Sequence, residues 1–333
     1  MNPVIAITMG DYNGIGPEVA AKSLLKIDTK ASTPVWIGTP SVLDKVIAQY
    51  GLPLLYHLAS DIYDIKEQHV NLLPLQSGHQ EAVISYGTVS GLAGALAMKS
   101  IEFTTELCMN RTVSAMVTSP ISKEALSLAS CRFPGHTEYL ASLTGSKEVL
   151  MILTSDRLTV ALCTIHLPLK NVAGQITDEV LTRNLTLFMN SLKKDLGIES
   201  PTIAVLALNP HAGDGGILGT EETDLIRPAL QKLNDKATRF EGPFPADGFF
   251  ASAAYENYDG IFAMYHDQGL IPFKMLSFGG GVNFTAGLPI IRTSPDHGTA
   301  FGIAGKGTAD SSSFLEAYHL ALKMVLNRNS FHQ

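Results

Sequence analysis

The hydrophobic positions of this chain fall into two kinds of segment that alternate along its length. Short, continuous apolar runs predict strands that are covered on both faces, as in parallel sheets. These runs span residues 4–9, 35–38, 115–118, 149–154, 159–165, 203–208 and 261–265. Between them lie segments with helical spacing, at residues 17–25, 91–107, 178–196, 221–233 and 313–326. The alternation predicts an α/β fold with a largely parallel sheet.

The length of the chain predicts two lobes. A chain of 333 residues is too long for one ordinary hydrophobic core and can fill two α/β lobes. No internal repeat, low-complexity tract or linker separates the lobes, so we expect them to be interwoven. We place residues 1–125 and 281–333 in one lobe, and residues 126–280 in the other.

Composition and charge narrow the range of partners. The chain has 24 basic and 31 acidic side chains, a net charge of −7, so it lacks the overall positive field that attracts nucleic acid. A few cationic side chains in a cleft could still bind a small anion. Cys108, Cys131 and Cys163 are widely spaced, which predicts reduced thiols and a cytoplasmic location. The N-terminal run lacks a leader pattern, and no apolar stretch approaches the roughly 20 residues of a membrane span.

Three of the apolar runs are followed closely by a histidine: His166, His211 and His266. Because ligands bind outside the carboxyl ends of parallel strands, these imidazoles can converge although they are far apart in the sequence. Three protein ligands with an open position are typical of a catalytic metal site, and imidazole suits zinc and cobalt. Each histidine alone is more simply explained as a strand cap. Their repetition is what predicts a metal site.

Two carboxylates accompany these histidines. Asp267 directly follows His266, and Asp247 lies in the turn-like segment 245–248. Either could orient a metal ligand or act as a catalytic base, although Asp and Gly are also ordinary turn residues. The residues alone do not rank the two.

The glycine-rich segments lack the standard nucleotide motifs. Segment 209–222 has no lysine after its last glycine and carries two carboxylates, so it is interpreted as a helix start. Segment 10–18 lacks the spacing of the dinucleotide fingerprint. Segment 134–138 is different, because Thr137 can cap a helix while His136 and free backbone amides face an anion. A plain helix cap explains this segment equally well.

A second candidate anion site lies between residues 274 and 307. Lys274, Asn283 and Arg292 could surround a phosphate or carboxylate with charge-assisted hydrogen bonds. The glycines at 279–281 permit a ligand to approach the backbone closely.

Six ordered segments, which together cover nearly the whole chain, resemble the signature segments of the 4-hydroxythreonine-4-phosphate dehydrogenase family. They are residues 14–18 (GIGPE), 134–138 (PGHTE), 164–168 (TIHLP), 208–213 (LNPHAG), 264–269 (MYHDQG) and 292–300 (RTSPDHGTA). The resemblance implies the two-lobed α/β/α fold of isocitrate and isopropylmalate dehydrogenases. One departure is the pair Tyr12-Asn13, where many relatives carry Pro-Ala.

The resemblance also implies an activity. The family oxidises 4-phosphooxy-L-threonine with NAD or NADP, and the product then loses carbon dioxide to give 3-amino-2-oxopropyl phosphate in pyridoxine 5′-phosphate biosynthesis. A homodimer with a shared active site is implied, as is one divalent metal, Zn, Mg or Co, on His166, His211 and His266, with at least one ligand from across the dimer.

The remaining site residues follow from the same resemblance. Substrate binding is implied for His136, Thr137, Lys274, Asn283 and Arg292. Segment 297–307 resembles a nucleotide loop, which implies cofactor binding by His297, Gly298, Thr299, Ala300 and Asp310. The identity of the base stays open between Asp247, Asp267 and a lysine.

Alternatives within the family are dehydrogenases for phosphorylated threonate or erythronate, or for an aromatic cis-dihydrodiol. From other classes, a metal-dependent hydrolase and a catalytically idle binding protein for phosphorylated metabolites also fit the residues. Neither nucleic acid nor membrane is an expected partner.

Overall fold

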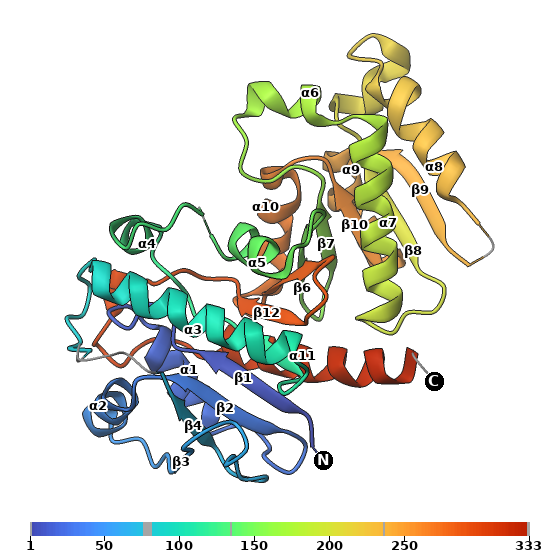
Figure 1. Cartoon of the computed structure of the whole chain (residues 1–333). Coiled ribbons are helices and arrows are strands. Elements are labelled where there is room, and N and C mark those ends of the chain that lie inside the picture. The colour runs from blue at the N-terminus through green and yellow to red at the C-terminus, as the bar shows by residue number, and fades with distance from the viewer. Residues whose placement is uncertain (1, 76–81, 134, 236, 332–333) are drawn as a thin grey trace. The chain divides into compact units, whose positions relative to one another are not determined.

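The computed structural model describes residues 2–75, 82–133, 135–235 and 237–331. The chain divides into two compact units (Figure 1). The first unit consists of Met1–Lys147 with Leu288–Val325, and the second of Glu148–Gly287 with Leu326–Gln333. No helix in the described ranges is long and apolar enough to cross a membrane. All three cysteines are free, as predicted.

The first unit is built on parallel strands in the order β3-β4-β2-β1-β5-β12. Strands β1 and β2 are buried almost throughout, which is why their sequences are continuously apolar rather than alternating. The strands are β1 (Val4–Thr8), β2 (Thr33–Gly38), β3 (His57–Leu58), β4 (Asn71–Pro74), β5 (Ala115–Val117) and β12 (Arg292–Pro295).

Helices connect these strands. Proline near the first position of α1 and α2 favours the start of each helix, where a missing backbone N–H costs nothing. The helices of this unit are α1 (Gly16–Leu24), α2 (Pro40–Tyr50), α3 (Gly91–Met109), α4 (Lys123–Leu128), α5 (His136–Thr144) and the greater part of α11 (Ser312–Phe331).

The second unit has strands in the order β11-β6-β7-β10-β8-β9. Four of them, β7, β10, β8 and β9, pair in parallel, whereas β6 is antiparallel to both β7 and β11. The four-residue link between β6 and β7 is too short to join parallel strands. The strands are β6 (Leu150–Thr154), β7 (Thr159–Leu162), β8 (Thr202–Leu206), β9 (Arg239–Phe244), β10 (Gly260–Ala263) and β11 (Val282–Ala286).

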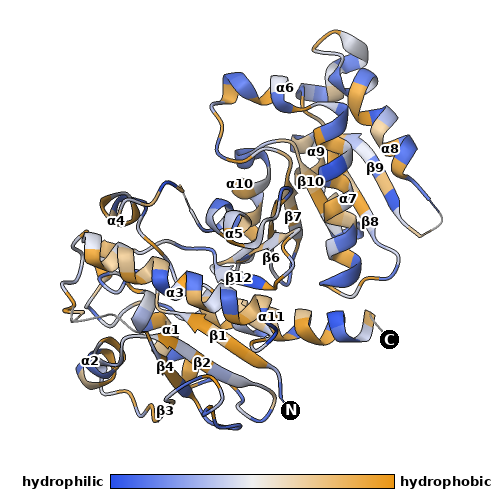
Figure 2. Ribbon diagram, in the orientation of Figure 1, coloured by the Kyte–Doolittle hydropathy of each residue, from blue (hydrophilic) through white to orange (hydrophobic). Residues whose placement is uncertain are grey.

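Amphipathic helices accompany these strands. In Figure 2 strand β1 of the first unit is orange along its length, whereas α7 of the second alternates between blue and orange. Helix α7 is capped by the Thr177 hydroxyl, with acidic residues in its first turn and lysines in its last, as the helix dipole favours. The helices are α6 (Val172–Gln175), α7 (Asp178–Lys194), α8 (Arg227–Leu233), α9 (Ala246–Ala251) and α10 (His266–Ser277). The predicted α/β class with largely parallel strands is confirmed.

The unit boundaries differ from the predicted ones. The first unit continues past residue 125 to Lys147, because α4 and α5 pack against α3. It resumes at Leu288 rather than at residue 281, because β11 pairs with β6 of the second unit. The end of α11 belongs to the second unit, where Arg328 Nε donates a 2.7 Å hydrogen bond to Asp195.

The contact between α3 and α4 gives a test of this packing. A Cβ atom at Gly94 would lie 2.1 Å from the carbonyl oxygen of Ala125, a backbone atom that cannot move unless α4 shifts. We therefore expect Gly94→Ala to lower the free energy of unfolding by about 2–3 kcal/mol, as overpacked cores do. Urea denaturation measures the change.

The matched control is Gly174→Ala in helix α6, where a Cβ atom would meet nothing within 4 Å. Alanine favours a helix over glycine by up to about 1 kcal/mol, so this variant should be neutral or slightly stabilised. Equal unfolding midpoints for the two variants would contradict the packing described.

Candidate active site

The first unit contains a buried arginine, Arg292. Arg292 is only 3% exposed and opens β12, beside β5. Its Nε and Nη2 atoms donate to Thr118 Oγ1 at 2.9 and 2.8 Å. Burial lowers the pKa of the guanidinium to about 9, and the nearby charge of Glu138 opposes that shift. The side chain therefore stays cationic at neutral pH.

His136 lies at the start of α5, near this cation. Burial and the charge of Arg292 hold the pKa of the imidazole well below its usual value, while a hydrogen bond to the Ser119 backbone raises it. Its Nε2 atom is buried and has no hydrogen-bond partner within the described ranges. A buried polar atom of this kind is costly unless a ligand or water satisfies it. The first unit thus holds a cation beside a neutral imidazole with an unused nitrogen.

The other predicted substrate residues are divided between the units. Thr137 is buried in the first turn of α5, next to His136. Lys274 is exposed on α10, and Asn283 is half-buried on β11, both in the second unit. Pro134 of the predicted anion segment lies outside the described residues.

Two of the three predicted metal ligands lie together in the second unit. The rings of His166 and His266 have centroids 5.9 Å apart. His166 follows β7 and His266 opens α10 directly after β10, and these two strands pair in parallel. Asp267 Oδ1 lies 2.7 Å from His266 Nδ1. A carboxylate in that position orients an imidazole so that its other nitrogen can bind a metal.

His211 does not complete this group within one chain. In the described part of the molecule, no three His, Cys, Asp or Glu side chains are grouped so that they could hold a metal ion. His211 is exposed and begins six consecutive residues with positive φ, from His211 to Gly216, in the segment after β8. Three of the six are not glycine, and such strain is typical of functional loops. An irregular loop, rather than the strand end, therefore carries His211.

Glu222 holds that loop in place, a role that the sequence analysis missed. Its buried Oε1 accepts hydrogen bonds from the backbone of Leu208 at 2.9 Å and of Asn209 at 2.7 Å. The sequence showed only two carboxylates at a helix start. A buried acid that binds backbone amides 13 and 14 residues earlier has no local sequence signal.

The two candidate bases differ in their surroundings. Asp267 contacts His266, as described above, although its side chain is 72% exposed. Asp247 is exposed in the first turn of α9. The structure thus places Asp267 beside a predicted metal ligand.

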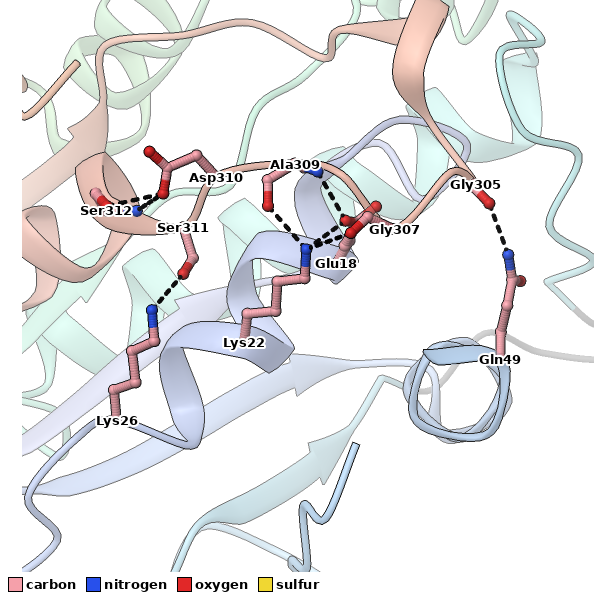
Figure 3. Close-up of polar contacts among 10 residues, drawn as sticks. All are labelled: Glu18, Lys22, Lys26, Gln49, Gly305, Gly307, Ala309, Asp310, Ser311 and Ser312. Atoms are coloured by element: carbon pink, nitrogen blue, oxygen red, sulfur yellow. Dashed lines mark hydrogen bonds and ion pairs between the residues drawn. The ribbon is translucent and has the colours of Figure 1, made fainter. Parts of the chain in front are cut away.

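The predicted nucleotide loop belongs to the first unit and is held by α1 and α2 (Figure 3). Lys22 Nζ donates to the carbonyl oxygens of Gly307 at 2.9 Å and Ala309 at 2.8 Å, and pairs with Glu18 at 2.7 Å. Gln49 Nε2 donates to the Gly305 carbonyl at 2.9 Å. The sequence indicated only that Glu18 and Lys22 could pair at i,i+4 spacing, not that Lys22 holds this loop.

Within this loop the predicted cofactor residues have distinct environments. The Nδ1 atom of His297 lies 3.1 Å from the Gly298 carbonyl, and its Nε2 atom is buried without a partner in the described ranges. Ala300 has a left-handed backbone, with φ of 43°. Asp310 accepts hydrogen bonds from the backbone and hydroxyl of Ser312, the first residue of α11, and these bonds lower its pKa.

The glycine-rich segment near the N-terminus supports the nucleotide loop instead of forming a fingerprint of its own. Ile15 N donates to the Thr299 carbonyl at 3.0 Å. A Cβ atom at Gly14 would lie 2.8 Å from that same oxygen, so only glycine permits this approach.

Comparisons with known proteins identify the family of this chain. The family model described as pyridoxal phosphate biosynthetic protein PdxA matches residues 30–321. A 4-hydroxythreonine-4-phosphate dehydrogenase of Bacteroides thetaiotaomicron is 41% identical over 328 residues, which cover 97% of this chain and 89% of that protein.

Solved structures give the same result. The crystal structure of 4-hydroxythreonine-4-phosphate dehydrogenase from Klebsiella pneumoniae has a TM-score of 0.86 and 36% identity, over 98% of each chain. A terephthalate 1,2-cis-dihydrodiol dehydrogenase from Burkholderia xenovorans has a TM-score of 0.68 and 25% identity, over 97% of this chain and 98% of that one. The predicted family resemblance is confirmed: this chain belongs to the PdxA family of pyridoxal phosphate biosynthetic proteins.

Proposed function

We propose that this protein is a cytoplasmic, nicotinamide-dependent 4-hydroxythreonine-4-phosphate dehydrogenase. It oxidises 4-phosphooxy-L-threonine with NAD or NADP, and the product loses carbon dioxide to give 3-amino-2-oxopropyl phosphate for pyridoxine 5′-phosphate synthesis. Family membership and the names of relatives about 41% identical support this reaction. The structural observation that carries it is the buried pair of Arg292 and His136.

This pair suits a phosphate group. The Arg292 guanidinium supplies a positive charge in a buried place, where charge-assisted hydrogen bonds to phosphate are strong. A bound phosphate would raise the pKa of His136, because an opposite charge favours the imidazolium. His136 Nε2 would then take up a proton and donate it to the anion in a hydrogen bond. The N-terminal end of α5, with Thr137, adds a favourable dipole.

The family resemblance adds Lys274 and Asn283 of the second unit to the substrate residues. Lys274 supplies a further cation for the anionic substrate, and the Asn283 amide can both donate and accept hydrogen bonds. These two assignments rest on the family resemblance.

His166 and His266 fit a divalent metal ion. Their two imidazoles favour zinc or cobalt over magnesium, which prefers oxygen ligands. A cation bound there supplies positive charge that acidifies a nearby hydroxyl group and stabilises the negative charge that develops as carbon dioxide leaves. Asp267 accepts from His266 Nδ1 and leaves Nε2 for the metal. Asp247 is the other candidate base.

The third ligand, His211, comes from a second copy of the chain. Exposed apolar side chains accompany all three histidines in sequence, and such exposure is typical of surfaces that another chain covers. They are Leu167 and Leu169 after His166, Ile217 and Leu218 after His211, and Ile271, Met275 and Phe278 on or directly after the helix that His266 opens. We therefore assign a homodimer in which each active site is shared.

The loop from His297 to Asp310 binds the nicotinamide cofactor, which supplies the acceptor for the hydride. Support comes from the anchoring of this loop on α1 and α2 and from the unused, buried Nε2 of His297, which a ligand could satisfy. His297, Gly298, Thr299 and Ala300 are the contact residues proposed. Asp310 takes part as the residue that fixes the start of α11.

A dihydrodiol dehydrogenase is the second candidate, because one structural relative is named for terephthalate 1,2-cis-dihydrodiol. A carboxylated ring could pair with Arg292 as a phosphate would. The two functions differ in substrate but share the family fold.

A substrate panel tests the reaction. With a divalent metal and NAD or NADP, we expect NADH or NADPH to form fastest from 4-phosphooxy-L-threonine, more slowly from 4-phosphothreonate, and not after chelation.

Arg292→Met should lower kcat/KM by about 10²–10³-fold, because a buried charged contact to phosphate is lost. Arg239→Met, which changes an exposed arginine, is the control. Turnover restricted to a dihydrodiol would refute the proposed substrate, and turnover without nicotinamide would indicate a hydrolase.

The shared site is tested by mixing two inactive variants. Co-expressed His166→Ala and His211→Ala chains should regain about one quarter of the wild-type activity, since half of the dimers then contain one intact site. The matched control pairs His166→Ala with His266→Ala, whose mutated ligands belong to the same half of the site, so no activity should return. Failure of the first pair to recover would show that each chain supplies its own His211.

A further inference from the structure

The pair Tyr12-Asn13, which departs from the family pattern, occupies the turn between β1 and α1. Asp11 N donates to the Pro120 carbonyl at 2.9 Å, and Asp11 Oδ1 accepts from Asn13 N at 2.9 Å. Tyr12 is buried and bonds to the Ser90 side chain, just before α3. Both ends of this turn are therefore fixed, and the Asn13 side chain points from a rigid base.

Asn13 holds a segment that is distant in the sequence. Its Nδ2 atom donates to the Thr88 carbonyl at 2.9 Å, and its Oδ1 atom accepts from Ser85 N at 2.8 Å. Its own carbonyl accepts from Gly87 N at 2.9 Å. Three hydrogen bonds from one residue thus fix the four residues from Ser85 to Thr88, which we name the strap.

The strap in turn contacts the nucleotide loop. Gly87 has a φ of 74°, and a Cβ atom there would lie 3.2 Å from the Phe301 carbonyl. The Tyr86 ring covers Gly305 so closely that a Cβ atom on that glycine would lie 2.7 Å from it. The Tyr86 hydroxyl donates to Gln49 Oε1 at 2.9 Å, and Gln49 Nε2 donates to the Gly305 carbonyl (Figure 3). The strap, α2 and the nucleotide loop are thereby interlocked.

The nucleotide loop depends on such contacts. Ala300, Gly305 and Gly307 have left-handed backbone angles, and the loop has no regular structure apart from the short turn Phe301–Ile303. A loop of this kind is held in one conformation by its neighbours, and a ligand binds more weakly when the competent conformation is only partly populated.

We propose that the strap preorganises the nucleotide loop and that Asn13 is a positioning residue for binding of the nicotinamide dinucleotide. The inference rests on the proposed function of the loop. Asn13 acts through the strap and touches none of the reacting atoms.

The test combines two variants with hydrogen–deuterium exchange and calorimetric binding of NAD or NADP. Asn13→Ala removes the side-chain bonds to Ser85 and Thr88. We expect faster exchange in residues 85–88 and 299–305 without cofactor, and a Kd about tenfold higher, as when the competent population falls to about a tenth. Asn2→Ala, which loses one asparagine bond to Lys30 in the same unit, should change neither.

Gln49→Leu is the second variant, because it removes both the bond to Gly305 and the bond from the Tyr86 hydroxyl, and leaves Asn13 with its bonds to the strap intact. It should accelerate exchange in residues 299–305 and weaken cofactor binding, with residues 85–88 less affected. If Asn13→Ala fails to fold, this variant decides: unchanged exchange and Kd overturn the inference.

The outcomes separate this inference from the proposed function. Faster exchange at 85–88 alone, with unchanged Kd in Asn13→Ala, shows that Asn13 has a merely structural role and overturns the inference. Absence of any NAD or NADP binding to the wild-type protein overturns the proposed function and the cofactor role of the strap together. Coupled exchange with weaker binding supports both.

Discussion

Parallel pairing of neighbouring strands is the constraint on which the chemistry of each unit depends. Because paired parallel strands end at the same edge, residues that follow them meet although they are far apart in the sequence. In the first unit the register of β5 and β12 pairs Arg292, the first residue of β12, with Met116, so that its side chain reaches Thr118 directly after β5, 174 residues earlier. In the second, pairing of β7 with β10 puts His166 beside His266. In each unit, the pairing of two parallel strands therefore brings one pair of candidate site residues together.

Burial of Arg292 in the first unit lowers the stability of the folded protein. Taking a guanidinium out of water opposes folding, and here it is accompanied by an imidazole that burial keeps neutral. A protein selected for stability alone would place an apolar residue at the start of β12. The retained charge is better explained by a ligand, since an anion compensates the cation and uses the free nitrogen of His136.

The sequence was sufficient for some features and not for others. Continuous apolar runs located seven of the strands, but β3, β4, β9, β11 and β12 were not predicted. Asn283 interrupts the apolar character of β11, and β12, with the sequence RTSP, has no apolar run at all. The His166–His266 pair was predictable, since strand ends determine it. The position of His211 was not predictable, because six consecutive residues with positive φ and the buried Glu222 determine the conformation of its loop. Support of the nucleotide loop by distant segments likewise has no local pattern.

The division of the chain has a consequence for biosynthesis. The second unit is continuous from Glu148 to Gly287, apart from its last eight residues, whereas the first needs Leu288–Val325 to complete its sheet. During synthesis, residues 1–147 cannot complete their sheet until β12 has been made. Residues 148–287, by contrast, can already fold around their own core. The middle of the chain can therefore fold first, and Arg292 is among the last residues to be synthesised and placed.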